Sequence, residues 1–187
     1  MNFKQVQVVN ELMSRFDKPW CVAGGWAIDL FIGRETREHG DIEIVIFRKD
    51  QLELKIHLKG WCFQKVVEGE LQPWGDEVLY LPIHEIHGVN TNGESLEVLL
   101  NETKGDEWRY RRNLNISYPL TSVIQFTKTG VPFLCPEVVL LYKMKNTRKK
   151  DHWDFMEVEE YLDDEKKSWL KQAIRSCDLD HKWLPLL

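Results

Sequence analysis

Two acidic residues separated by one position begin the alternating segment DIEIVIF, residues 41–47. On an extended strand Asp41 and Glu43 share a face and lie about 6.6 Å apart, so both carboxylates can reach one cation. Repulsion between close carboxylates favours a compensating divalent ion, and oxygen ligands suit Mg²⁺. Alternatively, the two residues are the solvated face of an edge strand.

A third carboxylate lies further along the chain, in the segment SLEVLL, residues 95–100. Leucine and valine alternate there with Glu97, which places Glu97 on the face opposite the apolar set if the segment is a strand. Glu94 and Glu102 are alternatives, but Glu94 falls in a turn and Glu102 lies past the predicted strand end. The pattern therefore favours Glu97 as the third acid of a carboxylate triad.

A glycine pair, Gly24-Gly25, separates the apolar run at residues 20–23 from the helix-like segment WAIDLFI. Without a Cβ, the backbone at such a turn can approach a ligand closely, and the free amides at the start of a helix can bind phosphate oxygens. A tight connection with no ligand is the alternative.

The hydrophobic periodicity predicts a chain that mixes helices and strands and then becomes all-helical. Proline at a first helical position supports a helix that starts at Pro136 and continues past Lys143. The change of pattern near Cys135 predicts a division into residues 1–132 and 133–187. The expected helices are 3–16, 26–32, 49–59 and several segments after 136. The expected strands are 20–23, 41–47, 61–67, 78–81, 83–89 and 95–100, with loop and short strand over 104–132.

Composition limits the classes of function. The 187 residues suit one domain or a domain with a small appendage, and 25 basic against 30 acidic residues give a net charge of −5. That balance argues against general nucleic-acid binding, which needs an excess of lysine and arginine. The sequence contains no apolar run of the roughly 20 residues that a membrane span needs, and the charged N-terminal segment resembles neither a signal peptide nor an anchor, so we expect a cytoplasmic protein.

Cysteine and histidine patterns suggest structural roles. The four cysteines are scattered among apolar neighbours without a C-x-x-C pair, which predicts reduced core thiols rather than a zinc site. His84 and His87 lack the H-E-x-x-H spacing of a metalloprotease helix, and on a strand they would face opposite sides, so we interpret them as structural. His39, two residues before Asp41, could orient a carboxylate, touch phosphate or be an ordinary loop histidine.

Several segments together resemble a known family. The run GGWAIDLFIGRETREHGDIEI resembles the glycine motif and carboxylate pair of the nucleotidyltransferase superfamily. In particular, it is similar to small bacterial proteins related to aminoglycoside 2''-adenylyltransferases and lincosamide nucleotidyltransferases. The resemblance continues through HEIHG, LEVLLNE, PEVVLLYKMKNTRKKDHWDF and HKWLPLL, and so covers nearly the whole chain.

This resemblance implies an α/β (α+β) fold: a mixed β-sheet flanked by helices, followed by a helical C-terminal part. It implies transfer of a nucleoside monophosphate from an NTP such as ATP to a hydroxyl, with release of pyrophosphate. Gly24 and Gly25 would then bind the triphosphate, Asp41 and Glu43 would hold Mg²⁺, and Glu97 would share a metal and serve as the base for the acceptor. Two Mg²⁺ ions would neutralise charge on the α-phosphate and the leaving pyrophosphate.

Such chemistry also needs basic side chains. Arg37 and Lys143 are the preferred nucleotide-binding residues, and the remaining candidates are Arg34, Lys145 and Arg148, of which the last two would share a helix face. Asp151 and Asp154 are expected to cap and salt-bridge the helical part, or else to face the acceptor cleft. The aromatic and basic cluster at residues 108–112 is interpreted as a strand edge beside the active cleft.

Two classes of function remain open. The first is a Mg²⁺-dependent nucleotidyltransferase, monomeric or homodimeric, acting on a small hydroxylated molecule such as an aminoglycoside or lincosamide, which would make it an antibiotic-resistance enzyme. The second is a catalytically weak nucleotide-binding, regulatory or toxin–antitoxin module of the same fold. It is motivated by Glu43, because the best-known resistance enzymes of the family have Asp at this position and the longer arm suits octahedral Mg²⁺ less well. The net charge disfavours a polymerase-like enzyme.

Overall fold

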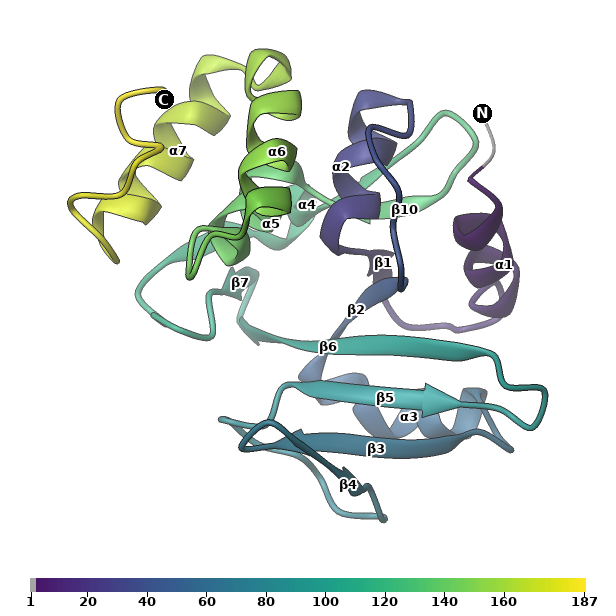
Figure 1. Cartoon of the computed structure of the whole chain (residues 1–187). Coiled ribbons are helices and arrows are strands. Elements are labelled where there is room, and N and C mark those ends of the chain that lie inside the picture. The colour runs from purple at the N-terminus through teal and green to yellow at the C-terminus, as the bar shows by residue number, and fades with distance from the viewer. Residues whose placement is uncertain (1–2) are drawn as a thin grey trace.

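The computed structural model describes residues 3–187, and its centre is a mixed β-sheet (Figure 1). Within these residues the sheet has ten strands in the order β4-β3-β5-β6-β2-β1-β10-β9, with β7 pairing with β6 and with β8. The strands are β1 Trp20–Val22, β2 Glu43–Phe47, β3 Cys62–Val67, β4 Glu70–Pro73, β5 Glu85–Val89, β6 Ser95–Lys104, β7 Glu107–Arg109, β8 Ser117–Pro119, β9 Ile124–Phe126 and β10 Pro132–Leu134.

Helices flank this sheet and make up the C-terminal part (Figure 1), so the predicted fold class is confirmed. Figure 1 shows α5, α6 and α7 gathered above one end of β6 and beside α2. The α-helices are α1 Lys4–Leu12, α2 Gly24–Ile32, α3 Gln51–His57, α4 Leu120–Val123, α5 Pro136–Lys143, α6 Lys149–Val158 and α7 Asp164–Arg175, and short 3₁₀ turns cover Arg48–Asp50 and Glu159–Tyr161.

Strands β2 and β6 pair in parallel, and each has an antiparallel neighbour on its other side, β1 and β5 respectively. Their apolar residues explain this central position. Ile44, Ile46, Val98 and Leu100 are fully buried on one face, as expected for strands covered by helices. The opposite face of the same strands therefore carries whatever polar side chains the strands contain.

Helices α2 and α5 are the most deeply buried helices beside the cleft. Five consecutive residues of α2, Trp26–Leu30, are buried, and so are the first six residues of α5. A helix with apolar residues around its whole circumference is stable only when other elements pack against every side. The sheet together with α6 and α7 supplies this cover, and α2 contacts both α5 and α6.

The predicted helix through Lys143, Lys145 and Arg148 is interrupted. Helix α5 ends at Lys143, and Asn146 adopts a left-handed backbone conformation with φ of +57° before Arg148 caps α6. The prediction that Lys145 and Arg148 share a helix face is therefore wrong, because the two residues lie in a turn.

The predicted strand at residues 78–81 is also absent. Side chains rather than a neighbouring strand satisfy its backbone: the Leu79 amide donates to Gln51 Oε1 at 2.7 Å, and the Leu79 carbonyl accepts from Arg48 Nη1 at 3.2 Å. These side-chain hydrogen bonds satisfy backbone groups of Leu79 that would otherwise pair with a neighbouring strand.

The cysteine prediction holds for two of the four thiols. Cys21 and Cys135 are buried, whereas Cys62 and Cys177 are exposed. Cys62 lies on the outward side of β3, where Phe63 takes the buried position, and Cys177 follows the end of α7. All four are free. Within residues 3–187, no helix combines the length and apolar character that crossing a bilayer requires.

One buried acid in α5 has no basic partner among the described ion pairs. The Glu137 side chain is fully buried, Tyr118 donates its hydroxyl hydrogen to Oε1, and Oε2 has no hydrogen-bond partner in the described part of the chain. Burial raises the pKa of Glu137, although the Tyr118 hydrogen bond opposes this shift. Folding therefore shifts Glu137 toward its protonated form relative to the unfolded chain.

Glu137→Gln should increase stability at neutral pH. A folded-state pKa above the unfolded value means that stability is fully present below about pH 4.5 and falls as pH rises through the folded-state pKa. The amide oxygen of the variant still accepts from Tyr118, and an amide does not ionise, so the variant does not lose stability as pH rises. The difference in thermal midpoint between variant and wild type should therefore grow from pH 4 to pH 7. Glu165→Gln, at an exposed acid of α7, is the control and should show no such trend.

Candidate active site

The floor of the candidate site is the polar face of β2, β6 and β5. Glu43 and Glu97 are direct partners in the parallel β2–β6 register, and His87 is the antiparallel partner of Glu97 on β5. Side chains of registered partners point to the same face of a sheet. Glu43, Glu97 and His87 therefore form a row across three neighbouring strands, although 54 positions separate the two acids in the chain.

Asp41 lies beside this row but outside the strand. Strand β2 begins at Glu43, and Asp41 occupies an exposed bend just before it. Asp41, His87 and Glu97 line a small cavity of about 80 Å³. Burial raises the pKa of Glu97, and the negative charges of Glu43 and, more weakly, Asp41 add to the shift. The acids named from the sequence are thus close enough to feel one another electrostatically.

The glycine pair allows two close approaches to the start of α2. Gly24 has φ of +61°, and a Cβ there would overlap Oε2 of Glu43. A Cβ on Gly25 would overlap the guanidinium of Arg37 and the ring of His39. Glycine is therefore favoured at Gly24 by its positive φ and at Gly25 by the close approach of Arg37 and His39, independently of any ligand.

The same glycine turn brings the start of α2 to the acids. The Ala23 amide donates to the Glu43 carbonyl at 2.8 Å, which attaches the turn to the start of β2. The next amides begin the helix, where the first N–H groups have no partner within the helix. Such a terminus favours an anion, and here it lies beside the carboxylate of Glu43.

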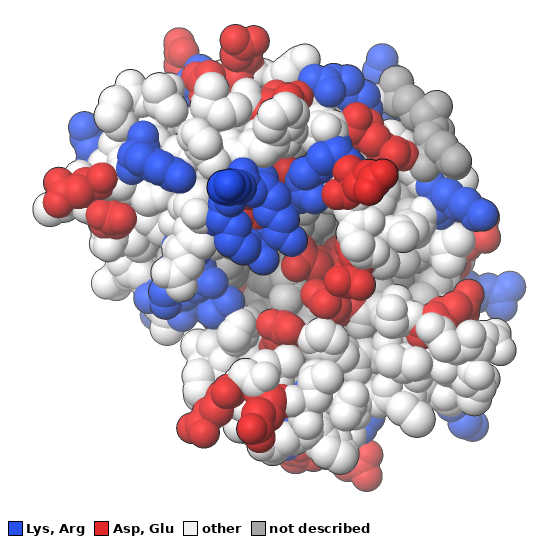
Figure 2. All heavy atoms as spheres, in the orientation of Figure 1, with Lys and Arg blue, Asp and Glu red and all other residues white. Residues whose placement is uncertain are grey.

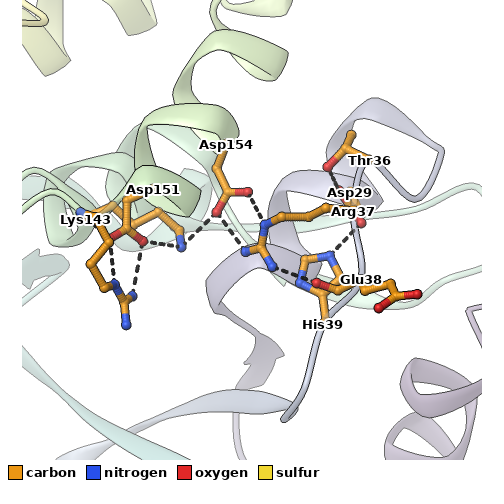
Figure 3. Close-up of polar contacts among 9 residues, drawn as sticks. Asp29, Thr36, Arg37, Glu38, His39, Lys143, Asp151 and Asp154 are labelled. Atoms are coloured by element: carbon orange, nitrogen blue, oxygen red, sulfur yellow. Dashed lines mark hydrogen bonds and ion pairs between the residues drawn. The ribbon is translucent and has the colours of Figure 1, made fainter.

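A chain of ion pairs links the loop after α2 to the C-terminal helices (Figure 3). Arg37 donates to both oxygens of Asp154, from Nε at 2.7 Å and from Nη2 at 2.9 Å. Lys143 Nζ lies 2.9 Å from Asp154 Oδ2 and 3.2 Å from Asp151 Oδ1. Arg148 donates to Asp151 from its side chain and its backbone amide, which makes Asp151 a helix cap for α6.

These contacts lower the pKa values of Asp151 and Asp154. Burial acts to raise the pKa of Asp151, but hydrogen bonds from Arg148 and Lys143 outweigh it and lower the pKa to about 2. Burial also acts to raise the pKa of Asp154, but the contacts with Arg37 and Lys143 outweigh burial and lower this pKa. The expectation that both aspartates cap and salt-bridge the helices agrees with these contacts. Arg37 and Lys143, the predicted nucleotide-binding residues, have charges that are already paired.

His39 belongs to the same region but has a different partner. Its Nε2 lies 2.7 Å from Oδ2 of the fully buried Asp29, whose other oxygen accepts from Thr36 (Figure 3). The ring also lies against Trp26, with centroids 4.3 Å apart. These contacts fix His39 to Asp29, and none of its described hydrogen bonds reaches Asp41 or Glu43, so the roles considered from the sequence stay predictions.

A cleft of about 410 Å³ opens at the Glu43 end of the row across β2, β6 and β5, whereas Asp41, His87 and Glu97 line the small cavity beside it. The floor of the cleft includes Glu43, Val45 and Leu99, and its walls include residues of α5, of the turn before α6 and of the segment after β7. Figure 2 shows lysine and arginine gathered on the rim above the hollow and acidic residues inside and below it. The cleft therefore has a negative floor and a basic wall.

Two residues of β5 were missed as site residues by the sequence interpretation. Glu85, His87 and Glu97 each offer a ligand atom, all within 4.8 Å of one another, so this group could hold a metal ion. His87 Nε2 lies 2.8 Å from Glu85 Oε1. The structural interpretation of His84 and His87 stays a prediction: β5 begins at Glu85, so His84 lies outside the strand and lines the cleft, while His87 Nδ1 lies 4.0 Å from Glu97 Oε1. The signal was the i, i+2 spacing of Glu85 and His87, the same spacing that identified Asp41 and Glu43.

Comparison with known proteins decides the family. Residues 5–158 match the family model described as aminoglycoside-2''-adenylyltransferase. The chain belongs to this family.

Other similarities agree with this assignment. The chain is 33% identical over 85 residues to a 2''-aminoglycoside nucleotidyltransferase of Klebsiella pneumoniae and 34% identical to one of Escherichia coli. Each match covers 42% of this chain and 48% of the relative, so the chain spans about half the length of the curated relatives it matches.

Solved structures share the fold of this aminoglycoside-2''-adenylyltransferase family member. The crystal structure of ANT(2'')-Ia in complex with adenylyl-2''-tobramycin has a TM-score of 0.64 at 16% identity and covers 92% of this chain and 97% of its own. The lincomycin-bound lincosamide adenylyltransferase LnuA has a TM-score of 0.58 at 17% identity and covers 86% of this chain and 98% of its own.

In this family member, Gly24→Ala should disrupt the site. The substitution places a side chain at positive φ, which costs about 1–2 kcal/mol, and pushes the Glu43 carboxylate away from the start of α2. Nucleotide affinity measured by calorimetry should fall at least about tenfold if Glu43 and the turn act together.

Gly33→Ala is the matched control for this change. Gly33 also has positive φ, +86°, but a Cβ there would meet no atom within 4 Å. It should lower the thermal midpoint as Gly24→Ala does, with nucleotide affinity unchanged. Equal nucleotide affinities for the two variants would contradict a role of the Gly24–Glu43 contact in binding.

Asp154→Ala should be strongly destabilising. It leaves Arg37 and Lys143 without the fully buried carboxylate that neutralises them, and breaking such a buried pair costs about 3–5 kcal/mol. Urea unfolding measures the loss. Glu157→Ala on the same helix is the control, because its partner Arg34 is exposed and solvent screens such a pair, so the variant should lose little stability. Similar losses for both variants would argue against the Asp154 network as the main link between α6 and the loop after α2.

Proposed function

We propose that this protein transfers a nucleoside monophosphate from an NTP to a hydroxyl of a small acceptor and releases pyrophosphate. The observation that carries the proposal is the row formed by Glu43 and Glu97 on adjacent parallel strands, with the Glu43 carboxylate against Gly24 at the start of α2. Membership of the aminoglycoside-2''-adenylyltransferase family supports the same reaction.

The residues present fit a divalent metal. Asp41, Glu43 and Glu97 supply carboxylate oxygens, the ligands that Mg²⁺ prefers. The raised pKa of Glu97, caused by burial and by its acidic neighbours, indicates repulsion that a bound cation would relieve. Mg²⁺ held there would neutralise phosphate charge and lower the pKa of the attacking hydroxyl. Two ions agree with the number of acids, and Glu85 and His87 extend the set of ligands at Glu97.

The chain's own residues would divide the remaining work. The amides at the start of α2 would bind phosphate oxygens, since a helix N-terminus favours anions. Glu97 would take the proton from the acceptor hydroxyl. Arg148, whose guanidinium feels the charge of Glu43 across the cleft, would face the triphosphate, and Lys143 would do so while paired with Asp151 and Asp154. Positioning and electrostatics would account for most of the rate.

One observation favours a second candidate, a nucleotide-binding module with little turnover. The longer arm of Glu43 reaches over Gly24, the position where the resemblance puts the triphosphate. Binding of nucleotide would then require Glu43 to move. Nucleotide binding without Mg²⁺-dependent pyrophosphate release would support the module, and absence of nucleotide binding would contradict both candidates.

The reaction is tested with Mg²⁺, labelled ATP or GTP and a panel of hydroxylated acceptors that includes tobramycin and lincomycin. We expect Mg²⁺-dependent pyrophosphate release that falls at least about a thousandfold in Asp41→Asn and Glu97→Gln, because each change removes a charge from the metal site. Glu94→Gln, at an exposed acid in the turn before β6, is the control and should retain activity. Full activity in Asp41→Asn or Glu97→Gln would remove that residue from the proposed site.

A further inference from the structure

Two arginines in the wall of the cleft have no carboxylate partner. The arginines in ion pairs within residues 3–187 are Arg34, Arg37, Arg48, Arg109 and Arg148, so Arg111 and Arg112 are not among them. Both line the cleft. The cations that the sequence assigned to nucleotide, Arg37 and Lys143, differ in being held by buried aspartates.

One aromatic ring holds the pair. The guanidinium carbons of Arg111 and Arg112 lie 5.5 Å and 5.7 Å from the ring centroid of Tyr142. Arg112 also donates to the Tyr142 carbonyl at 2.9 Å and to the Tyr110 hydroxyl at 3.2 Å. Tyr142 in turn donates its hydroxyl hydrogen to Asn101 at 3.2 Å, so the ring that carries both cations is itself fixed.

This arrangement is costly in the free protein. Burial, followed by the neighbouring charge of Arg112, lowers the pKa of Arg111, which means that the charged form is disfavoured there. Arg111 is half-buried and a guanidinium remains charged at any physiological pH, so a bound anion would relieve this cost. Planar guanidinium groups bind phosphate and carboxylate through paired hydrogen bonds.

The pair lies toward a different end of the cleft from Gly24. Arg111 feels the charge of Glu85, whereas Arg148 feels that of Glu43, next to the start of α2. Val45 and Leu99 separate these regions along the floor, because they are register partners one step beyond Glu43 and Glu97, and Glu85 is the β5 partner of Leu99. The cleft thus offers a basic site near the Leu99–Glu85 end of its floor, away from Gly24.

We propose that Arg111 and Arg112, held on Tyr142, form an oxyanion subsite that takes a phosphate or carboxylate group. The group belongs either to the acceptor or to the far phosphates of the NTP. The choice between these sources rests on the proposed function, but the existence of the subsite does not. An acceptor that reaches this end would carry an anionic or neutral group there, since an ammonium would be repelled.

Inorganic phosphate is the first probe. Side-chain Nε–H signals of arginine are recorded by NMR, with the Arg111 signal assigned from Arg111→Lys. We expect phosphate to shift the Arg111 signal, and Arg111→Ala to weaken phosphate affinity at least about tenfold. Arg175→Ala, at an exposed arginine of α7, is the matched control and should bind phosphate as the wild type does. The Arg111→Lys variant keeps the positive charge but lacks the planar guanidinium. Its phosphate affinity therefore separates loss of the paired hydrogen bonds from loss of the charge.

A Mg²⁺-loaded, non-hydrolysable ATP analogue then distinguishes the sources. If the analogue shifts the Arg111 signal and blocks phosphate, the subsite serves the nucleotide. If phosphate still binds to the analogue-saturated protein, it serves the acceptor. Phosphate binding at Arg111 without any nucleotide binding would keep the subsite and contradict the proposed function. The proposal is overturned if neither probe moves the Arg111 signal, or if Arg111→Ala binds phosphate as tightly as the wild type.

Discussion

The buried carboxylate of Asp154, shared between Arg37 and Lys143, is the contact on which the arrangement of the cleft depends. It joins three segments that are distant in sequence: the loop after α2, the end of α5 and the middle of α6. A fully buried charge is tolerated only when partners and hydrogen bonds compensate for lost solvation, and two cations do so here. The wall of the cleft is therefore fixed to the glycine turn through ionic contacts that act in a defined geometry.

The distribution of charge in the cleft follows from this arrangement. The sheet contributes acids in register on one polar face, and the C-terminal helices with the segment after β7 contribute the cations. Within the cleft the charged side chains are thus divided into a negative floor and a basic wall. This division suits the proposed function, in which metal-bridged nucleotide phosphates would lie between two surfaces that each neutralise charges of the opposite sign.

The glycine pair illustrates how one motif meets two requirements. From the sequence, Gly24-Gly25 indicated a phosphate-binding turn. In the folded protein the absence of side chains at the two glycines also leaves room for Glu43, Arg37 and His39, which occupy the space where Cβ atoms would lie. The motif therefore positions the acids and the loop as well as exposing the helix amides. This dual use explains why the pattern is informative even though a glycine pair alone is a common turn.

Local patterns in the sequence were enough for the mixture of helices and strands, for five of the ten described strands and for naming the candidate acids, whereas the fold class followed from the family resemblance. Alternation in residues 41–47 and 95–100 identified β2 and β6, because half-buried strands require it. What the sequence could not supply was the pairing of distant segments. Only the tertiary structure decided that Glu43 faces Glu97, that Glu85 and His87 join them, and that Arg37 and Lys143 are paired while Arg111 and Arg112 are not. The physical reason is that register, burial and ion pairing are set by contacts across the fold, whereas a sequence pattern specifies only which faces of each segment are apolar or charged.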